Sequence, residues 1–479
     1  MLKDKMRRVN CIHFVGIGGA GMGGIAEVLA KLNYTVQGSD LRQSDMTRHL
    51  TQQGVKVFIG HASEHVKKAD VVVVSSAIDG QNPEIIYAQE QRIPIIKRAQ
   101  MLAELMRFRF GIAVAGTHGK TTTTSMLATL YCAAGLDPTY VIGGKLNSAG
   151  HNAKLGESKY LIAEADESDA SFLHLLPTIA VITNIEADHL DAYAGDFSLM
   201  KKAYLDFLHN LPFYGLAVLC GDDANVRELI PNLARKYITY GLHADNDYQL
   251  VDIGYQAKQT VFTLRRPAPH QAIRVILPQP GVHNALNAAA AIAVATDQGI
   301  DEQEICAAMA SFAGIGRRFQ ILGNFSSEQN NLTLVDDYGH HPTEVMMTIK
   351  AARQSFPSRR LVMVYQPHRF SRTRDLYDEF VEVLSQVDVL VLIDIYSAGE
   401  TPISNVSSKS LSASIRQRGK IDPLYASSRA HLFQILADLL QHQDVLLTQG
   451  AGSIGEIATI LSTAQLARGR LLELSRENP

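Results

Sequence analysis

Cysteine is scarce in this chain of 479 residues. The four cysteines stand at Cys11, Cys132, Cys220 and Cys306, with more than 80 residues between successive positions. This spacing excludes a C-x-x-C metal site and argues against a disulfide framework. Such sparse cysteine usage is expected of a protein from a reducing compartment.

Long hydrophobic runs and a charge bias are missing as well. The longest nearly apolar stretch, residues 285–296, is interrupted by Asn287 and is too short for the ~20 residues that a membrane helix needs. The start, MLKDKMRRVN, is charged and is not followed by the apolar stretch of a secretion signal. The 45 Lys and Arg residues against 48 Asp and Glu residues exclude a general nucleic-acid binder or a polybasic membrane anchor. We therefore expect a soluble, cytoplasmic protein whose partners include neither nucleic acid nor membrane.

The composition and the pattern of short strands predict a multidomain α/β protein. Apolar residues make up 46% of the chain, and a length of 479 residues predicts about three domains at ~100–200 residues each. Short, nearly continuous apolar runs, typical of parallel strands covered on both faces, alternate with helical stretches. A helical segment at 98–109 and a glycine- and arginine-containing segment at 314–320 are the expected domain boundaries.

A glycine loop follows the first expected strand, 12–15. Gly16, Gly18 and Gly21 form a G-x-G-x-x-G motif between that strand and a helix. Such glycines permit a tight turn, a close approach to a pyrophosphate, and close packing of helix on strand. Asp40, at the end of the next strand, can bind ribose hydroxyls. The motif does not distinguish NAD from a UDP-sugar, so an NAD-dependent dehydrogenase remains an alternative.

A second glycine loop, GTHGKT, begins at Gly116 after another expected apolar strand, 111–115. The strict pattern G-x-x-x-x-G-K-[ST] fails because Val114 occupies the position of the first glycine. The remainder is intact, since Gly119 lets the backbone curl around a phosphate, Lys120 offers a cation and Thr121 can complete a Mg²⁺ shell. Two phosphate loops in one chain exceed what a dehydrogenase needs. A ligase that holds a sugar nucleotide and hydrolyses ATP needs both.

Acidic side chains follow two further expected strands, 160–163 and 179–183. The first ends in EADESD, where four acids within six positions beginning at Glu164 would repel one another without a cation. The second ends in NIEADHLD, which contains His189. Beside a phosphate loop these groups predict a Mg²⁺ site. Glu164 is the favoured ligand because it is the first side chain beyond the apolar run.

Eight motifs can be compared with known families. They read GIGGAGM, GTHGKTTTT, EADESD, TNIEADHLD, HNALNAAAA, GRRFQ, DDYGHHPTE and QPHRFSRT, and the similarity to which they belong runs from about Cys11 to Gly452. Together they resemble the Mur ligases of peptidoglycan synthesis. The resemblance implies an α/β fold of three domains, with a Rossmann-like UDP-sugar domain at 1–107, a P-loop ATPase-like domain at 108–316, and a Rossmann-like, amino-acid-binding and closing domain at 317–479.

The motifs, the strand-end positions and the resemblance together assign the site residues. The residues expected around ATP are Gly116, Thr117, His118, Gly119, Lys120, Thr121, Thr122, Asn284, Arg317 and Asp337. Those expected around the UDP-sugar are Gly18, Gly19, Ala20, Gly21, Met22, Ser39, Asp40, His61 and Ser75. The expected metal ligands are Thr121, Glu164 and His189. Those expected around the incoming amino acid are Tyr338, His340, Arg369 and Arg372.

The resemblance also implies roles in catalysis. Lys120 and Arg317 would neutralise charge on the transferred phosphate, and His189 would lie at the second Mg²⁺. Asn284 would contact adenine and Asp337 the ATP ribose. His340 is a candidate base for the amino-acid ammonium.

The implied reaction joins L-alanine to the lactyl carboxylate of UDP-N-acetylmuramate through an acyl phosphate formed from ATP. We expect two Mg²⁺ ions, no NAD, and a monomer or weak homodimer. Several Mur ligases use a carbamylated lysine about 15 residues beyond the histidine. That position falls near residues 203–204, with Lys201 and Lys202 out of register, so we expect none here.

Other functions remain open at this stage. A murein tripeptide ligase uses the same UDP-sugar, but its first glycine loop differs from GIGGAGM. Folylpolyglutamate synthetase resembles the later parts of the chain and lacks the first domain. A dehydrogenase would leave GTHGKT, EADESD and the arginine cluster in QPHRFSRTRD without a function. A nucleotide-gated binding protein would not need this complete set of metal and phosphate groups.

Overall fold

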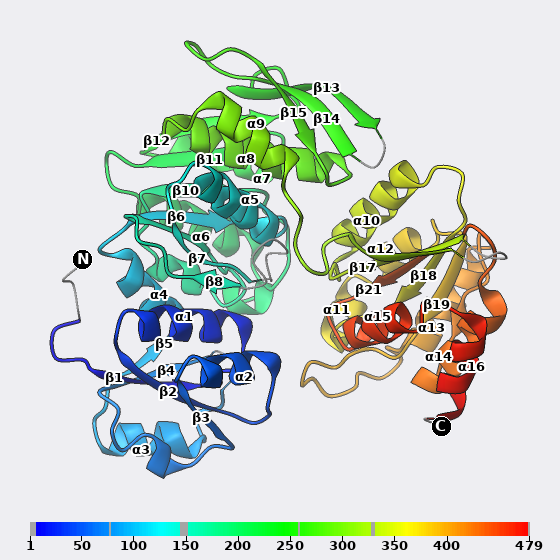
Figure 1. Ribbon diagram of the computed structural model, residues 1–479, viewed down its shortest axis with the longest axis horizontal. Coiled ribbons are helices and arrows are strands. Elements are labelled where there is room, and N and C mark those ends of the chain that lie inside the picture. The colour runs from blue at the N-terminus through cyan, green and yellow to red at the C-terminus, as the bar shows by residue number, and fades with distance from the viewer. Residues whose placement is uncertain (1–5, 76–77, 144–151, 257–258, 327–330, 478–479) are drawn as a thin grey trace. The chain divides into compact units, whose positions relative to one another are not determined.

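Three β-sheets organise the chain in the computed structural model (Figure 1). The structure describes residues 6–75, 78–143, 152–256, 259–326 and 331–477. A five-stranded and a ten-stranded sheet lie in one compact unit, composed of residues 1–254, 261–278 and 284–313. A six-stranded sheet lies in the other, composed of residues 255–260, 279–283 and 314–479. The expected three-domain α/β fold with parallel sheets is confirmed.

The first sheet is entirely parallel, in the order β3-β2-β1-β4-β5. Its strands are β1 (Cys11–Val15), β2 (Thr35–Asp40), β3 (Lys56–Ile59), β4 (Val71–Val74) and β5 (Ile95–Lys97). Apolar side chains on one face pack against α1 (Ala20–Lys31), α2 (Asp45–Gln52) and α4 (Arg98–Met106), and those on the other against α3 (Pro83–Glu90) and the 3₁₀ helix η1 (Ser63–His65). The first glycine loop and the residues after β2 and β3 therefore share one edge of the sheet.

The second sheet has the order β15-β14-β13-β12-β11-β10-β6-β9-β7-β8. Its strands are β6 (Phe110–Ala115), β7 (Thr139–Val141), β8 (Ala153–Lys154), β9 (Tyr160–Glu164), β10 (Ile179–Ile182), β11 (Leu216–Cys220), β12 (Lys236–Gly241), β13 (Tyr248–Gln256), β14 (Gln259–Arg265) and β15 (Ile273–Leu277). Its helices are α5 (Lys120–Ala133), α6 (Phe197–His209), α7 (Ala224–Leu229), α8 (Val282–Asp297), α9 (Glu302–Ala310), η2 (Ser171–His174), η3 (Leu190–Tyr193) and η4 (Ile230–Asn232). Strand β6, which leads into the second glycine loop, lies between β9 and β10, the two strands with acidic ends.

The third sheet has the order β16-β17-β21-β18-β19-β20, and only β16 is antiparallel to its neighbour. Its strands are β16 (Gln320–Ser326), β17 (Asn331–Asp337), β18 (Leu361–Tyr365), β19 (Val389–Leu392), β20 (Leu424–Tyr425) and β21 (Val445–Gln449). Helices α10 (Pro342–Ser355), α12 (Tyr377–Leu384) and α13 (Ser408–Gln417) cover one face, and α14 (Arg429–Leu439), α15 (Ile454–Thr463) and α16 (Arg468–Glu477) cover the other. The short helix α11 (Phe370–Asp375) follows β18.

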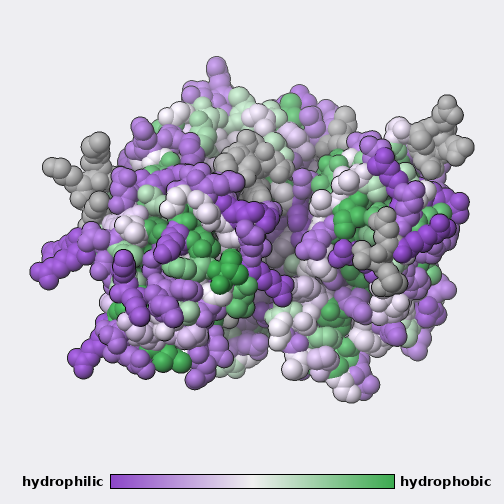
Figure 2. Space-filling model, turned by 60° about the horizontal axis from the view of Figure 1, so that its bottom comes forward, coloured by the Kyte–Doolittle hydropathy of each residue, from purple (hydrophilic) through white to green (hydrophobic). Residues whose placement is uncertain are grey.

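Hydrophilic side chains cover most of the face shown in Figure 2, with small hydrophobic patches among them. Large hydrophobic side chains exposed to solvent include Phe213, Tyr214 and Leu41. Among the residues that the structure describes, no helix combines the length and the apolar character needed to cross a bilayer.

Candidate functional site

The second glycine loop has the backbone geometry of a phosphate cradle. Gly116 and Gly119 have φ angles of +130° and +83°, where side chains other than hydrogen are disfavoured. A Cβ atom on Gly119 would lie 2.5 Å from Oδ1 of Asn287, and one on Gly116 would clash with the Thr183 hydroxyl. Since Gly119 directly precedes α5, the free amides of the helix N-terminus are available to a phosphate.

Residues after β10 hold this loop in place. The His118 amide donates to Oδ1 of Asn184 at 2.8 Å, and the Thr183 hydroxyl donates to the His118 carbonyl at 2.6 Å. The Glu186 amide donates to the Thr117 hydroxyl at 2.8 Å. Thr183 was expected to end the strand, but β10 stops at Ile182, which frees Thr183 to support the loop.

Lys120 is half-buried beneath the loop and is bound to Glu167, an acid that follows the neighbouring strand β9. Its Nζ donates to Gly116 O at 2.6 Å, to Thr117 O at 3.1 Å and to Oε1 of Glu167 at 2.8 Å. Burial alone would lower the pKa of Lys120, but Glu167 and Asp166 raise it above its ordinary value. Lys120 is therefore a fixed positive charge at the phosphate cradle.

The acidic end of β9 presents oxygen donors beside Lys120. Burial raises the pKa of Glu167, against the opposing effect of Lys120. Its Oε2 is buried and, among the described residues, has no hydrogen-bond partner. Glu164, the last residue of β9, accepts a hydrogen bond from the Gly143 amide at 2.7 Å.

These residues fit a magnesium–nucleotide complex. The donors are the Thr121 hydroxyl at the start of α5, the Glu164 carboxylate, and the unpartnered Oε2 of Glu167. Mg²⁺ prefers such oxygen ligands. His189 lies beyond β10 with a φ of +56°, and its Nε2 is 3.5 Å from Oδ2 of Asp188.

Helix α8 passes next to the phosphate cradle. Asn287 packs on Gly119, and Asn284 lies about one turn earlier on the same helix, with a buried side chain. Thr122 is also buried, in the first turn of α5. Asn284 is thus on the helix that borders the loop, in keeping with its expected place near the nucleotide.

The first glycine loop is held by the residues that end β2. The amides of Gly16 and Ile17 donate to Ser39 O at 2.8 and 3.0 Å. The Gly18 amide donates to Oδ2 of Asp40 at 2.8 Å. Asp40, which we expected to bind ribose, therefore also fixes the loop itself.

The other residues expected at the UDP-sugar lie along the same edge. Nδ1 of His61 is 2.9 Å from the Ser39 hydroxyl, and Ser75 directly follows β4. Gly19 precedes α1 and Ala20 is its first residue, whereas Met22 is buried in the core. The structure thus brings this group of predicted residues together on one sheet edge.

Arg98 links the two glycine-loop regions, and sequence reasoning missed it. Its Nη2 donates to Oδ2 of Asp166 at 2.9 Å, and a Cβ atom on Gly21 would lie 2.8 Å from its Nη1. Burial would raise the pKa of Asp166, but Arg98 and Lys120 lower it. Arg98 begins a helix at the expected domain boundary, so a search restricted to strand ends passes over it.

In the second unit, three of the four residues expected at the amino acid gather around His368. The rings of Tyr338 and His340 are 5.6 Å apart, and those of His340 and His368 are 5.3 Å apart. Nη1 of Arg372, a buried side chain, is 3.3 Å from Nδ1 of His368. His368 lies in the QPHRFSRT motif but had been given no role of its own.

Arg369 occupies a different position. It precedes α11 with a φ of +69°, and its Nε is 3.9 Å from Oε1 of Glu400. The hydroxyl of Ser371 also donates to that carboxylate oxygen, at 2.6 Å. Arg369 is therefore positioned by Glu400 rather than by the His368 group.

His340 is uncharged in this environment. Burial lowers its pKa to about 3, with Glu344 opposing and Arg372 and His368 adding to the effect. A neutral imidazole can accept a hydrogen bond from an ammonium group. A pKa this far below the working pH provides little driving force for full proton transfer.

Arg317 and Asp337 are anchored within the second unit. Nε of Arg317 donates to Oδ2 of Asp336 at 2.8 Å, and its Nη2 donates to Gly450 O at 2.6 Å. Asp337 is buried and accepts hydrogen bonds from the Phe319 and Gly339 amides at 2.8 and 2.7 Å. Burial raises the pKa of Asp337 although Arg318 opposes the shift. Their roles toward ATP stay predictions.

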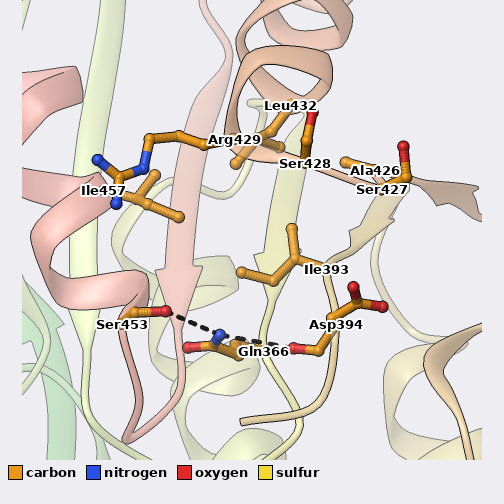
Figure 3. Close-up of a pocket in the computed structure, with 10 residues that line it drawn as sticks. All are labelled: Gln366, Ile393, Asp394, Ala426, Ser427, Ser428, Arg429, Leu432, Ser453 and Ile457. Carbon is orange, nitrogen blue, oxygen red and sulfur yellow. Dashed lines mark hydrogen bonds between the residues drawn. The ribbon is translucent and has the colours of Figure 1, made fainter. Parts of the chain in front are cut away.

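A cavity of about 210 Å³ opens at the carboxyl edge of the third sheet (Figure 3). Its apolar lining includes Ile393, Leu432 and Ile457, while Asp394 and Arg429 lie on opposite sides of it. Gln366 borders the cavity with its amide donating to the Ser453 hydroxyl at 3.1 Å. None of these residues is among those predicted from the sequence.

The two lysines weighed as carbamylation sites lie on α6. Lys201 pairs with Glu228, with Nζ 2.5 Å from Oε2. At the position expected for the modified lysine, Tyr204 is buried in the core, where its ring contacts that of Phe172 at 5.1 Å.

Three family models match the chain in succession. The Mur ligase family catalytic domain matches residues 11–110, the Mur ligase middle domain matches 114–295, and the Mur ligase glutamate ligase domain matches 317–452. The matched segments together span most of the chain.

Solved structures are similar over much of the chain. UDP-N-acetylmuramate–alanine ligase MurC from Thermotoga maritima is 27% identical with a TM-score of 0.79, covering 98% of this chain and 100% of that chain. A murein peptide ligase from Psychrobacter arcticus is 25% identical with a TM-score of 0.69, covering 95% and 98%. A UDP-N-acetylmuramate:L-alanyl-γ-D-glutamyl-meso-diaminopimelate ligase from Neisseria meningitides is 29% identical with a TM-score of 0.59, covering 64% and 100%.

Proposed function

The chain belongs to the Mur ligase family of ATP-dependent amide ligases, and on that premise we propose that it joins L-alanine to the lactyl carboxylate of UDP-N-acetylmuramate. The observation that carries the proposal is the similarity, across 98% of the chain, to the alanine-adding ligase from Thermotoga maritima. The product would be UDP-N-acetylmuramoyl-L-alanine, a peptidoglycan precursor, made in the cytoplasm by a monomer or weak homodimer.

The chemistry follows from the need to activate a carboxylate in water. The lactyl carboxylate attacks the γ-phosphate of ATP in line, giving an acyl phosphate and ADP. The amine of L-alanine then attacks the acyl carbon, and phosphate leaves from the tetrahedral intermediate. For phosphoryl transfer, the protein mainly has to position the reactants and neutralise their charge.

Residues of the first unit perform the activation in this proposal. The Gly116 to Lys120 cradle holds the phosphates, and Lys120 supplies a fixed positive charge. Thr121, Glu164 and His189 would hold two Mg²⁺ ions, which would supply charge neutralisation at the phosphates. Asn284 binds adenine, and the edge formed by Gly18, Ser39, Asp40 and His61 binds the UDP-sugar.

Residues of the second unit act on the amino acid and on the nucleotide in this proposal. We assign Arg372, Arg369 and Tyr338 to the L-alanine carboxylate, because a guanidinium holds a carboxylate bidentately. His340 accepts a hydrogen bond from the amine, and Arg317 and Asp337 reach the γ-phosphate and the ribose. The division into domains at 1–107, 108–316 and 317–479 is part of the same proposal.

A second candidate function is favoured by a specific observation. Two of the similar structures are ligases named for a murein peptide, at 25% and 29% identity. Ligation of a tripeptide to UDP-N-acetylmuramate would retain the fold and the chemistry, and would change only the acceptor.

Phosphate release from ATP and Mg²⁺ separates the two candidates. UDP-N-acetylmuramate is supplied with L-alanine, with L-alanyl-D-glutamyl-diaminopimelate, or with no acceptor. We expect release that depends on L-alanine and that Lys120→Ala abolishes, by about 10³-fold or more. Release that depends on the tripeptide would favour the second candidate. If neither acceptor led to phosphate release, both candidates would be contradicted.

A further inference from the structure

A buried carboxylate lies behind the edge of the first sheet that carries the predicted UDP-sugar residues. Glu84 is in the first turn of α3, and its side chain is fully buried. None of the predicted roles includes it. Burying a charge is costly unless hydrogen bonds and partner charges compensate it, so its surroundings decide what it does.

Five polar groups from other segments converge on this carboxylate. The Ser39 hydroxyl donates to Oε2 at 2.5 Å, while ring nitrogens of His13 and His61 lie 3.2 and 3.4 Å from the same oxygen. Nδ1 of His65 lies 2.8 Å from Oε1, and the Ala62 amide donates to Oε1 at 3.3 Å. Burial would raise the pKa of Glu84, but the bonds from His13 and Ser39 lower it to about 2, so the group is a carboxylate.

The network continues from Glu84 to the first glycine loop. Glu84 holds the side chain of Ser39. The carbonyl oxygen of Ser39 accepts hydrogen bonds from the Gly16 and Ile17 amides. The adjacent Asp40 accepts the Gly18 amide. Glu84 therefore holds the Ser39 side chain at the end of β2, and the residues at the end of β2 bind the loop.

Glu84 also restrains the segment after β3. Nδ1 of His61 lies 2.9 Å from the Ser39 hydroxyl, so Glu84, Ser39 and His61 form one triangle of polar contacts. The rings of His65 and Phe58 stack with centroids 4.0 Å apart, and Gln37 contacts Nδ1 of His13 at 3.3 Å. His65 and His13 are thus each held by a second residue in addition to Glu84.

We propose that Glu84 is a positioning residue that sets Ser39, His61 and the first glycine loop for binding the UDP-sugar. The inference rests on the proposed function, because it concerns the same sugar-nucleotide site. A purely structural role would require only that the domain be stabilised, whereas two of the groups around Glu84, Ser39 and His61, are predicted ligands themselves, and the Ala62 amide directly follows His61.

The test is Glu84→Gln in the full-length enzyme, with Glu27→Gln as the matched control. Glu27 is another buried carboxylate of the first domain, paired with Lys31 of α1 and His49 of α2. We expect Glu84→Gln to raise the KM and the calorimetric Kd for UDP-N-acetylmuramate about tenfold or more. The kcat and the KM for ATP should stay within about twofold of wild type, and Glu84→Asp should restore part of the affinity. Glu27→Gln should leave all these constants unchanged.

Two outcomes would overturn the inference. A Glu84→Gln enzyme with a lowered melting temperature but wild-type affinity for UDP-N-acetylmuramate would reduce Glu84 to a structural role. If that variant does not fold, His65→Gln removes one donor and should raise the same KM alone by about threefold, so an unchanged KM would overturn the inference as well. A wild-type enzyme that binds no UDP-N-acetylmuramate is a separate result, because it overturns the proposed function and with it the site on which the inference rests.

Discussion

Arg372 is the residue whose proposed role can be isolated most cleanly. It is buried, and it contacts His368 within the Tyr338 and His340 group. Arg372→Ala should raise the KM for L-alanine about tenfold or more, because a buried charge-assisted contact to the carboxylate is lost. The KM for ATP should change little.

Arg374→Ala is the matched control for that measurement. Arg374 lies on the same short helix and is exposed, with its Nε donating to the adjacent Asp375. Steady-state kinetics with each substrate varied in turn gives both constants. Equal increases in the two KM values for Arg372→Ala would remove this residue from the amino-acid site.

Glu84 should also impose a pH dependence on stability. Its pKa, lowered to about 2 in the folded protein against 4.5 ordinarily, means that folding favours the ionised form. That stabilisation is present above pH 4.5 and is lost as the pH falls toward 2. The histidines facing the carboxylate are His13, His61 and His65.

Thermal unfolding of wild type and Glu84→Gln at pH 7 and pH 3 checks this dependence. At pH 7 the variant should be less stable by roughly 1–3 kcal/mol. The difference in the free energy of unfolding should narrow at pH 3, because Glu84 is then mostly protonated in the unfolded wild-type chain but still mostly ionised in the folded protein. A stability difference between the two proteins that stays constant or widens at pH 3 would contradict the ionised state assigned to Glu84.

The positions of single residues were predictable where a motif carried them and not where distant segments supply the partners. Lys120 and Glu164 follow from their places in a loop and at a strand end. Arg98 and Glu84 do not, because Arg98 finds its partner 68 residues away and Glu84 finds one 71 residues away. Such pairs arise from tertiary packing, which no local pattern in the sequence records.

At the level of elements, we expect the loop that leads from β6 into α5 to tolerate substitutions least. Gly119→Ala should weaken ATP binding at least tenfold, since a methyl group there meets Asn287 and the φ of +83° is disfavoured for alanine. Binding of UDP-N-acetylmuramate should be unaffected. Calorimetric titration with each nucleotide measures both.

Gly135→Ala separates the clash from the backbone effect. Gly135 follows the other end of α5 with a φ of +68°, and a Cβ atom there would meet nothing within 4 Å. This control carries a similar conformational penalty without the contact. If both variants bound ATP with equal affinity, the packing of Asn287 on the loop would have no bearing on the nucleotide.

The strands and their polar ends were predictable because buried parallel strands are read directly from apolar runs. The expected strands 111–115, 160–163 and 179–183 correspond to β6, β9 and β10 with differences of one residue. The contacts that the polar residues at these strand ends make were less predictable. Asp40 holds the Gly18 amide, a contact that depends on how the loop turns back over β2.

Across the whole molecule, the decisive feature is the presence of two phosphate loops in one chain. That feature pointed from the sequence to a ligase, and the three matching family models leave the dehydrogenase alternative without support. The cavity bordered by Asp394 and Arg429 was not predictable, because its lining comes from separate segments, the residues after β18, β19 and β20 together with helices α14 and α15, which only the fold brings together.

The central claim is that this chain uses ATP to activate the carboxylate of a sugar nucleotide for attack by an amine. The most direct test uses UDP-N-acetylmuramate labelled with ¹⁸O in both oxygens of the lactyl carboxylate, together with ATP, Mg²⁺ and L-alanine. Mass spectrometry of the released phosphate should find one ¹⁸O atom, because one carboxylate oxygen leaves with the phosphoryl group, and the amide product should keep the other. Unlabelled phosphate, or release of AMP in place of ADP, would contradict the account.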